Sequence, residues 1–131
     1  MRKQYMFRAK KMLADGIPGE WVHGSNLWSG QCERPHTTMI NGTPVVGDTL
    51  GQYSNIDDSN GKEIYEGDLL LFENQGQGSL REVVFAEGCF CAIPVNYGKG
   101  ICAKEWGLFN NPFKGKVVGN VHDNPDFKTE V

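Results

Sequence analysis

The stretch that decides the fold runs from residue 63 to residue 72 and reads Glu-Ile-Tyr-Glu-Gly-Asp-Leu-Leu-Leu-Phe. Its last four residues form a short apolar run, which predicts a strand buried on both faces. Gly67 permits a tight turn just before that run, and Asp68 can close the turn by bonding to nearby backbone. The segment therefore predicts short strands joined by tight turns.

The flanking sequence repeats this pattern of short strands and turns. Residues 37–40 and 43–46 enclose Asn41-Gly42, which favours a type I′ hairpin, and Pro44 favours an edge position for the returning strand. Further strands are expected at residues 5–10, 21–28, 81–95 (a long strand or a hairpin arm) and 116–121, and one short helix at 102–109. We therefore expect a mainly β fold, a barrel-like assembly of many short strands with at most one or two short helices.

The chain has 131 residues, of which 39% are hydrophobic and 22% charged. These values predict one globular domain. We expect a single β domain over residues 1–131, in which an N-terminal part (1–50) and a second part (51–131) pack together. The sequence contains no apolar leader and no apolar run long enough to span a membrane, so we expect a cytoplasmic protein without a membrane partner.

Charge is distributed unevenly along the chain. Residues 1–11 carry five basic side chains and no acid, whereas residues 48–87 carry nine acids against two basic side chains. Three explanations fit this charge pattern. The basic and acidic regions can complement each other within the molecule, they can form a self-associating surface, or the basic region can be an edge that meets nucleic acid. A dedicated DNA-binding domain is usually basic overall, and the formal net charge here is -3.

The segment around the deciding stretch resembles the signature block of the YopX family. The similarity runs from Gly51-Gln52-Tyr53 through Asp58-Ser59-Asn60-Gly61-Lys62-Glu63-Ile64-Tyr65-Glu66-Gly67-Asp68, and it extends to Phe7-Arg8-Ala9, Val84–Phe90 and Val118–Pro125. The chain has Ser54-Asn55 where the family usually has Thr-Gly. The resemblance implies a phage- or prophage-encoded protein with a convoluted, barrel-like β structure. The family has no established activity, so it implies no catalytic residues.

The acidic cluster at Glu66 and Asp68 allows three interpretations, of which a partner-recognition edge is one. A carboxylate site for acid–base or metal chemistry is another, and a turn closed by its own carboxylate is the third. Counting Gly61 as the sixth position of a calcium loop places Ile56 where a carboxylate is required, so that template fails. Glu66 and Asp68 remain candidates for a partner-recognition edge.

The four cysteines are expected to be reduced thiols in ordinary buried positions. Cys89 and Cys91 lie two residues apart, which places both on one face of a strand. The available spacings, Cys-x-Cys and Cys-x3-His, do not match those of structural zinc sites, so no metal is expected.

Most aromatic side chains should belong to the core. Trp21 and Trp28 are candidates for exposed platforms on which a base or a peptide stacks. No phosphate-binding loop, His-Glu-x-x-His or Gly-x-Ser-x-Gly motif occurs, so we expect no enzyme and no cofactor.

We therefore expect a non-enzymatic binding module for a protein partner or for itself, with Trp21, Trp28, Glu66 and Asp68 as candidate binding residues. One alternative is a single-stranded nucleic-acid-binding protein that uses the basic N-terminal stretch and the two tryptophans. Another is an unrecognised enzyme that uses Glu66, Asp68 or a Cys–His pair.

Overall fold

In the computed structural model of this chain, structure is described for residues 6–30, 37–74, 77–86, 88–95, 107 and 115–126. The chain divides into two compact units, Met1–Tyr53 and Ser54–Val131. The division falls close to the boundary expected between residues 50 and 51. That the two parts pack together as a single domain stays a prediction.

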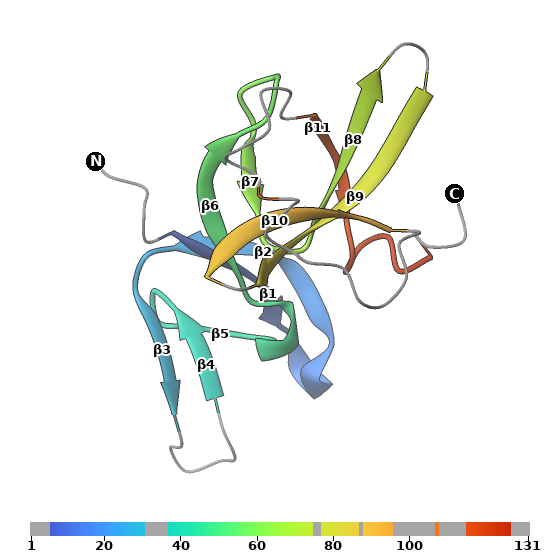
Figure 1. The fold of residues 1–131 in the computed structure, drawn as a ribbon. Helices are drawn as coiled ribbons and strands as arrows, with labels where there is room; N and C mark the ends of the chain where they lie inside the picture. The colour runs from blue at the N-terminus through green and yellow to red at the C-terminus, as the bar shows by residue number, and fades with distance from the viewer. Residues whose placement is uncertain are drawn as a thin grey trace. The chain divides into compact units, whose positions relative to one another are not determined.

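The first unit, blue to green in Figure 1, is organised around its first strand. Its elements are β1 (Phe7–Met12), the 3-10 turn η1 (Ala14–Gly16), β2 (Pro18–Gly24), β3 (Leu27–Gly30), β4 (Thr37–Ile40), β5 (Thr43–Val45), the 3-10 turn η2 (Gly47–Thr49) and the start of β6 (Gly51–Asp57). β1 pairs antiparallel with β2, β5 and β6. The buried residues Ala9, Ile40 and Val45 form the core of this unit.

The hairpin of β4 and β5 has the expected turn but not the expected position. Asn41 and Gly42 both have positive φ, 49° and 81°, as a type I′ turn requires. The prediction that Pro44 keeps β5 at an edge was wrong, because β5 lies between β4 and β1. Proline is tolerated there because β1 pairs with β5 only at Val45, so no ladder bond is needed at Pro44.

The aromatic segment 21–28 forms two strands rather than the single strand expected. β2 ends at Gly24 and β3 begins at Leu27, where the chain turns to pair with β4. A side chain at position 24 would clash, because an added Cβ would lie 2.4 Å from the amide nitrogen of Asn41. Gly24 therefore lets β2 end against the β4–β5 turn.

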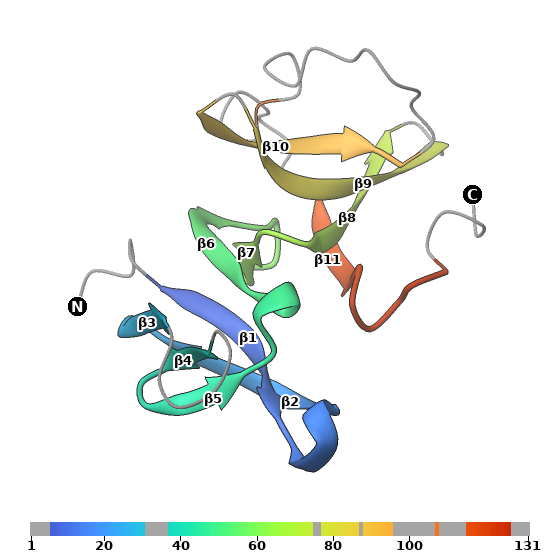
Figure 2. The ribbon, with the colours of Figure 1, turned by 90° about the horizontal axis from the view of Figure 1, so that it is seen from below.

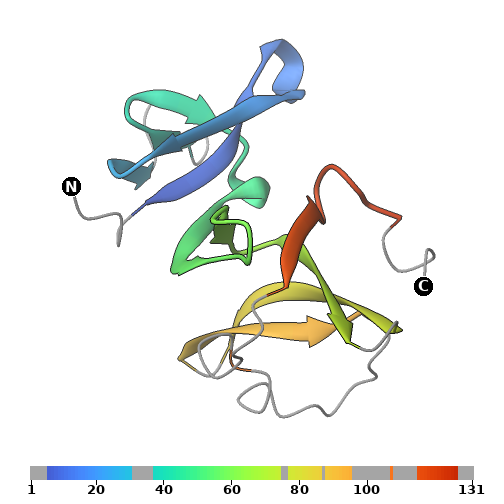
Figure 3. The same ribbon diagram turned by 90° about the horizontal axis from the view of Figure 1, so that it is seen from above.

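The second unit contains the strand predicted from the short apolar run at residues 69–72. Its elements are the rest of β6, β7 (Glu63–Tyr65), β8 (Asp68–Asn74), β9 (Gln77–Ala86), β10 (Cys89–Pro94) and β11 (Lys116–Asn120). Four of these strands lie side by side in the order β10-β9-β8-β11 (Figure 3). β8 is bonded on both edges, and Leu70 is fully buried in a core with Ile64, Phe72, Val83 and Ala92.

Residues 81–95 form a hairpin, the second of the two forms expected for this segment. β9 and β10 pair in register from Ala86–Cys89 to Arg81–Pro94. Gly88 has φ +83° and lies in the turn, so it does not mark a bulge within a strand. The hairpin places Phe85 edge to face with Phe90, their ring centroids 5.0 Å apart.

The expectation of a mainly β fold with very little helix is confirmed, since the described helical elements are the three-residue turns η1 and η2. The helix expected at 102–109 lies outside the described residues except for Gly107, which forms a β-bridge with Cys91. Within the described part of the chain, no helix is both long and apolar enough to cross a membrane.

Candidate functional site

Asp58 is a carboxylate of the signature block that accepts three backbone hydrogen bonds. Its Oδ1 accepts the backbone N–H groups of Asn60 and Lys62, each at 2.8 Å, and its Oδ2 accepts that of Val117 at 2.9 Å. The side chain is buried, with 7% relative exposure. A neighbouring bond from the Ser59 N–H to the Gly115 carbonyl, at 2.9 Å, joins the same two segments. Asp58 therefore fastens the β6–β7 turn to the start of β11.

The local sequence explains why the turn presents its N–H groups to Asp58. The Asp58 N–H bonds to the Lys62 carbonyl at 2.7 Å, which closes a three-residue loop. Gly61 takes φ +81° in that loop, the left-handed position that such loops reserve for glycine. With the chain so folded, the Asp58 carboxylate can reach the amides two and four residues ahead.

The hydrogen bonds also set the acidity of this group. Burial raises the pKa of Asp58, but the backbone N–H groups of Val117, Lys62 and Asn60, with the positive charge of Lys62, outweigh burial and hold the pKa below its ordinary value. A carboxylate with a lowered pKa is ionised at neutral pH and is a poor proton donor. Asp58 thus acts as a fixed negative acceptor.

The lowered pKa predicts a pH dependence of stability. Because the folded state holds Asp58 more acidic than the unfolded state does, its contribution is present above the unfolded pKa of ~3.9. The contribution is lost as pH falls through the lower folded pKa. Urea unfolding between pH 7 and pH 2.5 should show this loss in the wild type. The Asp58→Asn variant should be less stable at pH 7 and should lose less on acidification, so an equal loss in both proteins would contradict the assignment.

Asp68 has a structural role similar to that of Asp58. Its Oδ2 accepts the Tyr65 N–H at 2.8 Å, and its relative exposure is 1%. Gly67, at φ +92°, donates its N–H to the Val83 carbonyl and accepts from the Val121 N–H, at 2.8 and 2.9 Å. The Glu66–Asp68 turn is therefore bonded to β9 and to the end of β11. This geometry fits the interpretation of Asp68 as a turn-closing carboxylate. The side chain of Glu66 is only half-buried.

Asn120 is a third buried polar anchor, and sequence reasoning missed it. Its Oδ1 accepts the N–H groups of His122 and Asp123 at 3.0 and 2.9 Å, and its Nδ2 donates to Asp123 at 2.9 Å. An asparagine followed by polar residues and a proline is a turn signal that could have identified it. Asn120 fixes the turn that follows β11.

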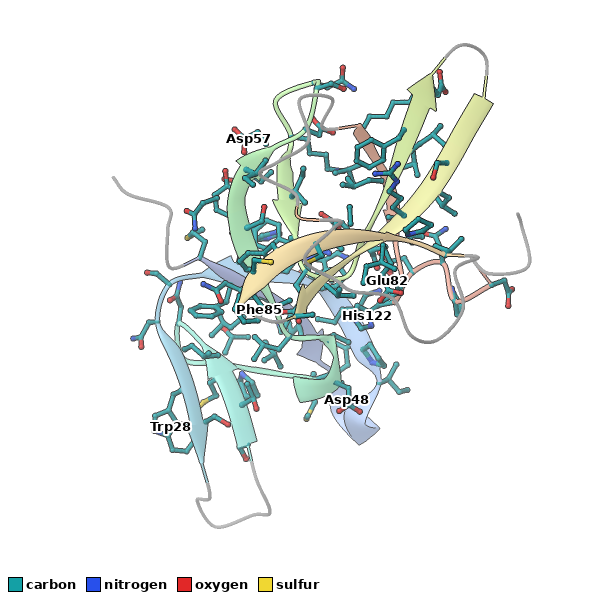
Figure 4. The ribbon with its side chains drawn as sticks, viewed as in Figure 1. Trp28, Asp48, Asp57, Glu82, Phe85 and His122 are labelled. Carbon is teal, nitrogen blue, oxygen red and sulfur yellow. The ribbon has the colours of Figure 1, made fainter. Side chains whose placement is uncertain are left out.

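The two candidate tryptophans lie on strands that do not pair with each other. On β2, Trp21 has the Arg8 guanidinium 4.5 Å and the Lys10 Nζ 5.3 Å from its ring centroid. The ring face under Arg8 is not available to a base. Trp28 lies on β3, is 40% exposed and points away from the strands (Figure 4). The structure thus leaves Trp28 as the more accessible platform.

The tip of the β1–β2 hairpin, whose backbone is seen in Figure 2, carries exposed apolar side chains that the sequence reasoning did not single out. Met12, Leu13 and Ile17 are 42%, 46% and 57% exposed. The Leu13 N–H bonds to the Ile17 carbonyl at 2.9 Å, which brings these residues together. Large apolar residues on both sides of an Asp-Gly turn were the available signal. We call Met12, Leu13 and Ile17 the hairpin tip.

Among the residues that the structure describes, no group of three or more histidine, cysteine, aspartate or glutamate side chains is placed to hold a metal ion. Cys32 and Cys102, which the expectation of four reduced thiols included, lie outside the described residues.

Comparison with known proteins identifies the family. The family model described as YopX protein matches residues 7–127. No curated protein matches the chain. Among solved structures, the crystal structure of protein EF1440 from Enterococcus faecalis is similar, with 19% identity and a TM-score of 0.49 over 93% of this chain and 96% of that one.

Proposed function

The chain belongs to the YopX protein family, and from this premise we propose that it is a non-enzymatic binding module that associates with a second copy of itself. The observation that carries the proposal is an exposed apolar hairpin tip on a unit of one charge sign, together with an exposed phenylalanine, Phe85, that packs on the partly buried Phe90 of a unit of the other sign. The family resemblance further supports a phage or prophage origin and a role in the bacterial cytoplasm.

The hairpin tip has the features of a protein-binding surface. Three large apolar side chains gather at the end of one hairpin, and exposed Ala14 and Pro18 flank them. Single exposed apolar residues are ordinary, but a contiguous group on a projecting element usually marks an interaction site. Full burial of a large apolar side chain is worth about 1.5–3 kcal/mol, and these side chains, each about half covered already, can contribute about half of that value to an interface.

The second unit offers an aromatic patch of matching character. Phe85 is 53% exposed on β9 (Figure 4). Its edge-to-face partner Phe90 is paired with it on β10 and is partly buried against the core. We call Phe85 and Phe90 the aromatic patch. Glu82 lies on the same strand as Phe85 and is partly exposed, so β9 also presents a carboxylate three residues before Phe85. Aromatic side chains are enriched among the residues that dominate binding energy, which makes this patch a suitable receptor for an apolar tip.

The opposite charges of the two units support contact between unlike units of two copies. Residues 1–53 hold six basic and four acidic side chains, a formal charge of +2, whereas residues 54–131 hold seven basic and twelve acidic side chains, a formal charge of -5. Opposite charges steer encounter and discourage contact between like units. In a closed dimer, each tip would meet the other copy's aromatic patch, and this two-fold arrangement is the commonest among oligomers.

Light scattering and sedimentation across ~1–100 μM protein test the proposal, since interfaces worth roughly 5.5–8 kcal/mol dissociate in that range. The wild type should approach twice the chain mass, and association should weaken at high salt because the charges are screened. The double variant Leu13→Ser/Ile17→Ser should raise the dissociation constant by at least about 30-fold, the equivalent of one lost anchor of ~2 kcal/mol.

The matched control is Val118→Ser, which alters a side chain that is 50% exposed on β11 but belongs to neither surface. It should associate like the wild type. A wild-type chain that remains monomeric throughout the range would overturn the proposal. If the monomeric chain also bound a labelled single-stranded oligonucleotide with an affinity that falls as salt rises, single-stranded nucleic-acid binding would replace self-association as the proposed function.

A further inference from the structure

Two thiols stand side by side at the start of β10. Cys89 and Cys91 are two residues apart on the strand, so their side chains leave the same face, and their sulfur atoms are 3.5 Å apart. Cys91 is fully buried and Cys89 is partly exposed. Both occur as thiols. One member of the pair is therefore accessible from outside and the other is sheltered behind it.

The surroundings of the pair suit a cation. The Ala86 carbonyl oxygen accepts from both thiols, with its oxygen 3.6 Å from the sulfur of Cys89 and 4.0 Å from that of Cys91. This oxygen directs its negative end toward the pair. Cys89 is only partly buried, so an ion can reach the pair from its side.

We propose that Cys89 and Cys91 form a two-sulfur chelating site for a soft divalent cation of the Zn²⁺ type. At a metal–sulfur distance of ~2.3 Å, two sulfurs on a tetrahedral ion lie roughly 3.8 Å apart. The observed separation of 3.5 Å is within a few tenths of an ångström of that value. Both sulfurs can therefore bind one ion without rearrangement of the strand.

A disulfide fits the same pair less well. Residues i and i+2 of a strand are ~6.6 Å apart at Cα, close to the upper limit of ~6.8 Å for disulfides. The sulfurs would have to approach to ~2.05 Å, which requires β10 to bend. Cys89 and Cys91 are held by pairing with Ala86 and Val84 of β9, and this pairing resists bending. Chelation is the chemistry that the extended strand permits.

Binding is an exchange of protons for a metal ion, without oxidation. Each thiol loses its proton to the buffer, both sulfur–metal bonds form, and two protons are released for each divalent ion. Among the residues that the structure describes, no third histidine, cysteine or carboxylate joins the pair. The protein thus supplies two ligands to the ion.

Titration of the phosphine-reduced protein with Cd²⁺ tests the site, since cadmium–thiolate bonds give a charge-transfer absorption in the ultraviolet. The wild type should saturate with high affinity at one equivalent, and calorimetry in buffers of different ionisation enthalpy should report release of about two protons. Zn²⁺ should displace the Cd²⁺ and abolish the absorption.

Cys89→Ser is the main variant because Cys89 is only partly buried, and it should weaken Cd²⁺ binding by at least ~100-fold. Loss of an outer-sphere partner already costs 10–100-fold, and a direct ligand contributes more. Cys91→Ser, checked for folding by circular dichroism, should behave alike, and the control Cys32→Ser/Cys102→Ser should bind like the wild type. Absent saturation in the wild type, equal binding by Cys89→Ser, or loss of binding in the control would each overturn the proposal.

Discussion

Replacing Asp58 with alanine is expected to lower the free energy of unfolding by about 4 kcal/mol. The change leaves three buried or partly buried N–H groups, those of Asn60, Lys62 and Val117, without their acceptor. Each unsatisfied group costs ~1–3 kcal/mol, and water entering the vacated space offsets part of the sum. Urea unfolding followed by tryptophan fluorescence measures the loss.

Asp57 provides the matched control for Asp58 because it is the preceding residue, has the same chemistry and is exposed. Asp57→Ala should change stability by no more than about 1 kcal/mol, as is usual for surface charges. Equal losses in the two variants would show that the signature turn is not held by the Asp58 carboxylate. An unchanged urea dependence of the free energy in both proteins would confirm that the unfolded states are comparable.

The second large effect is expected from Asp68→Ala, which should cost about 3 kcal/mol. Asp68 is 1% exposed and accepts the buried Tyr65 N–H, so its removal leaves a buried donor unsatisfied and a cavity beside it. The neighbouring turn bonds of Gly67 to Val83 and Val121 should weaken with it. Thermal and urea unfolding would both register the change.

The control for Asp68 is Glu66→Ala, which removes a half-buried carboxylate two residues away. It should cost less than about 1 kcal/mol. This contrast also separates a structural role from a recognition role for the pair of candidate residues. If Glu66→Ala destabilised the protein as much as Asp68→Ala, the assignment of the turn to Asp68 would be wrong.

Several strands of this protein could be predicted from local patterns, because period-2 alternation and turn residues act within a few positions. The apolar run at Leu69–Phe72 and the Asn41-Gly42 hairpin are examples. However, β6 (Gly51–Asp57) was not predicted, and residues 21–28 form two strands instead of one. The same dipeptide at Asn60-Gly61 forms a different turn, in which only Gly61 has positive φ. Loop length decides between the two turns, and the dipeptide alone does not reveal it.

The long-range anchors could not be predicted from one sequence. Asp58 was recognisable as part of the signature block, but its bond to Val117 joins residues 59 positions apart. Likewise, the stacking of Arg8 over Trp21 depends on the β1–β2 register. Because Arg8 covers one face of the ring, Trp21 is a weaker candidate for stacking a ligand than the sequence suggested. Whether the hairpin tip is exposed depends on which other segments pack against it, and the local sequence alone does not determine that.

The central claim, that the hairpin tip of one copy meets the aromatic patch of another, is tested most directly by mixing two variants. Leu13→Ser/Ile17→Ser destroys the tip and leaves the patch, whereas Phe85→Ser destroys the patch and leaves the tip. Each variant alone should sediment as a monomer because neither can form a complete contact. An equimolar mixture should associate through one intact contact, more weakly than the wild type. A mixture that stays monomeric while the wild type dimerises, or either variant dimerising alone like the wild type, would contradict the account.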